Sequence, residues 1–88
     1  MTAYEQQAES MYNQLIAMET DAEPNQLFLC SYLLGHISLV SAEQGDTALQ
    51  FRQQLEHSLE SAFKVDQLSE QDINDIRSLW QQLSETAA

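Results

Sequence analysis

The chain has little of several residue types, and these shortages exclude whole classes of protein. Of its 88 residues only 3 are Lys or Arg, against 14 Asp and Glu, so the formal net charge is −11. Proteins that bind nucleic acid neutralise phosphates with Lys and Arg, so we expect no nucleic-acid partner. The two glycines are too few for a glycine-rich phosphate-binding loop. The single Cys30 cannot form an internal disulfide, and we expect a reduced, packed thiol.

Long hydrophobic runs are also missing. Unbroken apolar runs reach only four residues, as at 27–30, which is far short of a membrane span. The first ten residues, MTAYEQQAES, have neither a basic nor an apolar region typical of a secretory signal. Together with the reduced thiol, these features lead us to expect a cytoplasmic protein without membrane association.

What is present predicts an all-α protein. Apolar residues recur in steps of three and four, which places them on one face of a helix. We expect four helices, at about residues 2–19, 25–44, 47–64 and 69–85. Short connections between them favour antiparallel neighbours. The sequence therefore predicts one domain, residues 1–88, folded as a compact antiparallel four-helix bundle with up-down topology.

Residues that end and begin helices support these boundaries. Gly45 is placed where a helix can stop in the left-handed conformation, and Asp46 is a candidate cap for the next helix. Ser69 and Asp72 have the spacing of a capping box. On the first helix, Tyr12 and Ile16 are expected to widen the buried face.

The second predicted helix is apolar around most of its circumference, and a helix of this kind must be buried on more than one side. Its small residues form a separate line, which either permits close backbone approach or faces outward: Ser31, Gly35, Ser38 and Ala42. Its excess apolar residues are buried either by a central position among the other helices or by a two-fold dimer. We expect a monomer with a central second helix, and the homodimer stays open.

One polar group could carry chemistry. Tyr32, His36 and Glu43 follow one another along one side of the second predicted helix. They form either a ligand pocket with a titratable histidine or a hydrogen-bond network between helices. No other residues have the spacing of a catalytic set, and the two histidines make a metal site improbable. We therefore assign no catalytic, cofactor-binding or metal-binding residues. Trp80 and Tyr12 lie on apolar stripes, where core packing is expected.

A family resemblance rests on spaced residues. Leu27-Phe28, Ser31-Tyr32-Leu33, Gly35-His36 and Ala42-Glu43, with the later Ser58-Leu59-Glu60, Ala62, Leu68-Ser69, Asp72 and Trp80, resemble the YfcL family of small gammaproteobacterial proteins. One form of the family pattern has Arg where this chain has Leu34. The resemblance implies a bacterial cytosolic protein and carries no activity, substrate or cofactor with it.

Two functional hypotheses follow. In the first, the chain is a non-enzymatic interaction module that presents an acidic helical surface to a basic protein partner. The acidic residues are spread along the chain, which is also typical of charge that serves solubility. In the second, the chain is a small-ligand binding protein or an enzyme that uses Tyr32, His36 and Glu43. A pocket that reaches His36 would favour the second hypothesis.

Overall fold

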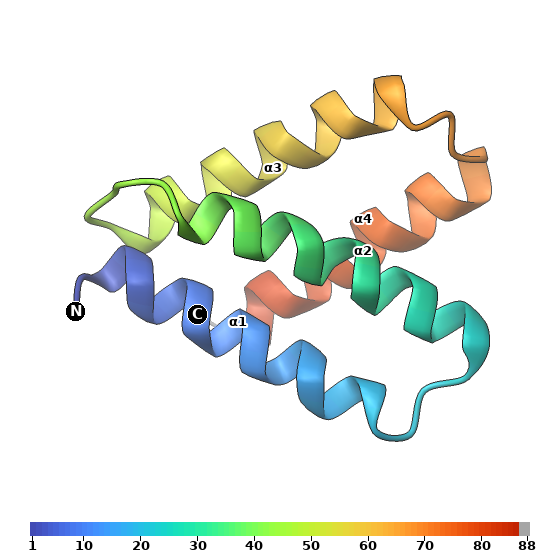
Figure 1. Ribbon diagram of the computed structural model, residues 1–88, viewed down its shortest axis with the longest axis horizontal. Helices are drawn as coiled ribbons and strands as arrows, with labels where there is room; N and C mark the ends of the chain where they lie inside the picture. Colours follow the sequence, from blue (N-terminus) through green and yellow to red (C-terminus); the bar gives the residue numbers. More distant parts are fainter. Residues whose placement is uncertain (87–88) are drawn as a thin grey trace.

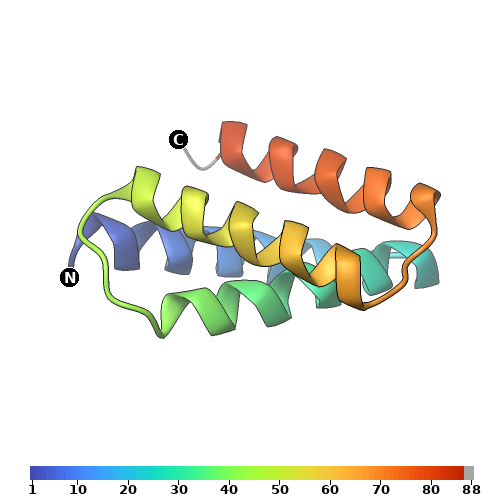
Figure 2. The ribbon, with the colours of Figure 1, turned by 90° about the horizontal axis from the view of Figure 1, so that it is seen from above.

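The computed structural model describes residues 1–86, with side chains to residue 85. They form α1 (Ala3–Glu19), α2 (Pro24–Ser41), α3 (Ala48–Val65) and α4 (Glu70–Thr86). Consecutive helices run in opposite directions, so the bundle has up-down topology (Figure 1; Figure 2). The predicted all-α, antiparallel four-helix bundle is confirmed.

Side-chain caps fix the helix starts. Thr2 and Thr47 each form a capping box, with Glu5 and Gln50 respectively. The Ser69 hydroxyl accepts a hydrogen bond from the Asp72 backbone N–H at 3.1 Å, as predicted. The predicted cap at Asp46 is wrong. Thr47 adopts the extended backbone of an N-cap, and its hydroxyl accepts from the Gln50 N–H at 3.1 Å.

The end of α2 also differs from the prediction. The helix stops at Ser41, three residues before the expected residue 44. Gly45 does not have a positive φ, so the predicted left-handed stop there is wrong. Within residues 1–86 the residue with a positive φ is Gln67, at 52°, directly after Asp66, the C-cap of α3. The left-handed turn therefore lies between α3 and α4.

Replacing Thr47 by Ala is expected to lower the free energy of unfolding by about 1 kcal/mol, within the usual range of about 0.5–2 kcal/mol for a lost N-cap. The neighbouring Asp46→Ala variant is the matched control, and we expect a change of less than about 0.5 kcal/mol. Urea denaturation followed by circular dichroism measures both. An equal loss in the two variants would mean that Asp46 shares the capping role.

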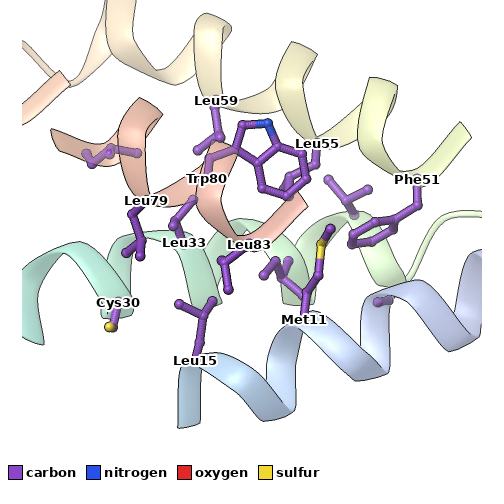
Figure 3. Close-up of a cluster of buried hydrophobic side chains, with 14 of the residues drawn as sticks. Met11, Leu15, Cys30, Leu33, Phe51, Leu55, Leu59, Leu79, Trp80 and Leu83 are labelled. Carbon is purple, nitrogen blue, oxygen red and sulfur yellow. The ribbon is translucent and has the colours of Figure 1, made fainter. Parts of the chain in front are cut away.

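All four helices contribute to one hydrophobic core (Figure 3). Trp80 is buried, as predicted, and its indole N–H donates to Glu56 Oε1 at 3.2 Å. Cys30 is a buried free thiol, and burial raises its pKa. Tyr12 and Ile16 do not join the core: their side chains are 42% and 43% exposed. They lie at the edge of the buried stripe of α1, so the expected widening of that stripe is wrong.

The second helix packs against the three other helices, as the first helix also does. This packing does not bury all of its apolar residues. Leu27 and Phe28 are 38% and 40% exposed, and Leu39 is 63% exposed. Because no helix within residues 1–86 covers the outward side of α2, the expectation that a central position hides every apolar side chain is wrong.

Candidate functional site

Tyr32 and His36 lie one turn apart on the side of α2 that faces α3. Their ring centroids are 4.9 Å apart. His36 Nδ1 lies 2.8 Å from the Ser58 hydroxyl on α3. The Tyr32 hydroxyl donates to Asp66 Oδ2 at 2.9 Å, and its ring stacks on Phe63 with centroids 6.1 Å apart. The two rings therefore connect α2 to the second half of α3.

The third predicted member, Glu43, does not join them. Because α2 ends at Ser41, Glu43 lies in the loop before α3 and not on the helix. It lines a groove of about 420 Å³, together with Gln53, Gln54, His57, Ser58 and Ser61. Ser58 connects the groove to the ring cluster, because it lines the groove and its hydroxyl is hydrogen-bonded to His36. Since Ser58 and not His36 lines this groove, the geometry does not favour the small-ligand hypothesis.

Burial sets the protonation of both rings. It raises the pKa of Tyr32 to about 12, with smaller contributions from the hydrogen bond and the negative charge of Asp66. Burial lowers the pKa of His36, because the charged imidazolium loses solvation, while the Asp66 carboxylate opposes this effect. His36 is therefore neutral at pH 7, and its Nδ1 donates to or accepts from Ser58 according to the tautomer.

The serine–histidine pair lacks the third member of a hydrolytic triad. In a triad the carboxylate orients the histidine through its other ring nitrogen. Here the nearby carboxylate, Asp66, instead accepts a hydrogen bond from the Tyr32 hydroxyl. Among the described side chains, no three His, Cys, Asp or Glu come together to hold a metal ion. What this cluster does chemically is to connect two helices by hydrogen bonds. The sequence missed Ser58 and Asp66, because both come from α3 and nothing in local spacing pairs them with α2.

The lowered pKa of His36 gives a pH-dependent stability. An unfolded histidine has a pKa of about 6.5, so between that value and the lower folded pKa the unfolded chain binds more protons. The contribution of His36 to the free energy of unfolding is therefore fully present above about pH 6.5 and is lost as the pH falls through this window. We expect His36→Gln to lose this part of the pH dependence. Urea midpoints of both proteins at about pH 5 and pH 8 test this. If the midpoint shifts between the two pH values by the same amount in His36→Gln as in the wild type, the prediction is wrong.

A second surface lies between α1 and α2, on the other side of α2 from His36. It contains a groove of about 320 Å³. Two groups of residues line the groove. The N-terminal residue and α1 contribute Met1, Glu5, Ala8, Glu9 and Tyr12, and α2 contributes Ile37, Ser38 and Ser41. The groove thus has apolar and small residues along it and two carboxylates at its edge.

The Lys and Arg side chains are confined to the third and fourth helices. Arg52 and Lys64 lie on α3, and Arg77 lies on α4. Arg77 pairs with Glu60 at 2.6 Å and lies over the Phe63 ring. Residues 1–50 contain seven carboxylates and no Lys or Arg. The surface formed by α1 and α2 therefore carries carboxylates without Lys or Arg side chains, and the N-terminal amino group supplies positive charge near Glu5.

Comparison with models of protein families relates the chain to a known family. The family model described as YfcL protein matches residues 2–85, which include nearly all of the four helices. The resemblance to this family that the sequence indicated is thereby confirmed. No curated protein and no solved structure matches the chain. Within residues 1–86, none of the helices has the length and apolarity needed to cross a membrane.

Proposed function

We propose that this chain, which belongs to the YfcL family, is a non-enzymatic module that presents an acidic helical surface to a basic protein partner. The observation that carries the proposal is the segregation of charge. All three Lys and Arg residues lie on α3 and α4, while residues 1–50 contain seven of the 14 carboxylates and no basic side chain. Unpaired charge of one sign steers a partner of the opposite sign and fixes its orientation.

The same proposal places the chain as a monomer in the bacterial cytoplasm. Cys30 supports this placement, because it is a free thiol buried in the core and needs no oxidising compartment. The net charge of −11 opposes close association of two copies through acidic faces.

Affinity capture from bacterial lysate at low and high ionic strength tests the proposed function. We expect a specific basic protein to be retained at low ionic strength and released at high ionic strength, because salt screens charges at a surface. A double variant, Glu9→Gln with Asp21→Asn, should retain less of it. The control is Glu70→Gln with Glu85→Gln, which removes the same charge from α4. If no protein is enriched at any ionic strength, the proposal is wrong.

A further inference from the structure

The outward side of α2 carries no charge at all. Residues 24–41 contain no Asp, Glu, Lys or Arg. We define the α2 outer face by its exposed members, which are Leu27, Phe28, Ser31, Gly35, Ser38 and Leu39. By contrast, the exposed sides of the other helices carry carboxylates, such as Glu9, Glu60 and Glu70. A helix face that meets only water is usually polar and charged, so the α2 outer face has the composition of an interface.

The middle of this face is open and flat. A Cβ atom added at Gly35 would meet no other atom within 4 Å. Ser31 and Ser38 are small and exposed on either side of it along the helix. Small side chains shorten the distance at which a second helix can pack, because that distance depends on the side chains at the contact. Leu27 and Leu39 lie toward the two ends and supply apolar contact area.

The edge of the face toward α1 is both apolar and acidic. Tyr12 and Ile16 lie one turn apart on α1 and are about two-fifths exposed, at 42% and 43%. The groove of about 320 Å³ brings Tyr12 beside Ser38 and places Glu5 and Glu9 on its α1 side. A ligand on the α2 outer face would therefore meet the exposed Glu9 carboxylate along this edge, beside Glu5, which also accepts hydrogen bonds from Thr2.

We infer that the α2 outer face and the adjoining groove bind one amphipathic helix of the basic partner, with its apolar stripe over Gly35 and its Lys or Arg residues beside Glu5 and Glu9. This inference rests on the proposed function and adds where the partner binds and in what form. A helix laid in an apolar groove is a recurrent mode of peptide recognition. A second copy of the chain fits less well, because it would bring its own α1 carboxylates to an edge that already carries Glu5 and Glu9 and has no Lys or Arg side chain.

The test uses a fluorescein-labelled helical peptide of Lys, Leu and Ala, with Leu and Ala on one face and Lys along both edges of that face. The comparison peptide has the same composition in a scrambled order without an apolar face. Fluorescence anisotropy measures binding to the whole chain and to Gly35→Gln, which fills the open centre of the α2 outer face. Ser78→Gln, on the exposed side of α4, is the matched control. Gln is a better helix former than Gly, so the first variant keeps its fold.

We expect the striped peptide to bind the wild type and Ser78→Gln equally, and Gly35→Gln at least about tenfold more weakly. Glu9→Gln should weaken binding by up to about fivefold at low ionic strength, and Glu70→Gln should not change it.

If both peptides bind equally and Gly35→Gln has no effect, the inference is wrong while the acidic surface still attracts basic partners. If neither peptide binds at any ionic strength, both the inference and the proposed function are wrong. If light scattering shows a dimer that Gly35→Gln dissociates, the occupant is a second copy and the inference is wrong.

Discussion

Replacing Phe51 by Ala is expected to lower the free energy of unfolding by about 3–5 kcal/mol. The Phe51 side chain is fully buried, and its ring meets the Tyr4 ring edge to face, with centroids 5.3 Å apart. A domain of this length has a total stability of about 4–13 kcal/mol. The variant therefore lies close to the limit of stable folding, and urea denaturation at low temperature followed by circular dichroism measures the loss.

Leu49→Ala is the matched control for this prediction. Leu49 lies on the same helix two residues earlier and is 60% exposed, so its truncation leaves no cavity. We expect a change within about 0.5 kcal/mol. Comparable losses in the two variants would mean that α3 does not present the Phe51 side of its surface to the core.

The fold was predictable because periodicity alone defines a buried stripe. On α3, Phe51, Leu55 and Leu59 repeat at four-residue intervals, and all three are buried. The helix ends were less predictable, because two adjacent residues, Asp46 and Thr47, are both good caps. Backbone geometry decides between such neighbours, and here Thr47 has the extended conformation that lets its hydroxyl reach the Gln50 N–H.

The edges of a stripe were not predictable from one helix. Tyr12 and Ile16 are apolar in character and follow the helical period, yet both are substantially exposed. Whether such an edge is covered depends on how far the neighbouring helix extends over it. Tyr12 lines the groove between α1 and the uncharged side of α2, and no other helix among the described residues covers that side. The failed prediction and the proposed partner site therefore concern the same surface.

The candidate site was predictable in part, for a related reason. Four-residue spacing on one helix correctly brings Tyr32 and His36 together. Their partners, Asp66 and Ser58, are 34 and 22 residues away in sequence, and only the register between α2 and α3 selects them. Glu43 was included because the helix was expected to continue to residue 44. The earlier end of α2 instead puts it in the loop that contains Gly45.

That loop packs directly on the core, and the two glycines of the chain therefore differ in what they tolerate. A Cβ at Gly45 would lie closer than 3.0 Å to three ring carbons of Tyr4. The ring is fully buried, and its hydroxyl lies 2.7 Å from both the Val40 carbonyl oxygen and the Gln54 side-chain amide. The Tyr4 backbone N–H also donates to the Asp46 carbonyl at 3.3 Å. Because the ring is held at both ends, it cannot move aside, and the loop must shift.

Gly45→Ala is thus expected to lower the free energy of unfolding by about 1–3 kcal/mol, the usual cost of overpacking. Gly35→Ala is the matched control, because its Cβ meets nothing within 4 Å in the middle of α2. Alanine there should raise the free energy of unfolding by about 0.5–1 kcal/mol, since glycine loses more backbone freedom in a helix. Thermal and urea midpoints of both variants measure the two shifts. If both variants shift the midpoint in the same direction, the loop is not closely packed against Tyr4, because that contact is the reason why the two substitutions should have opposite effects.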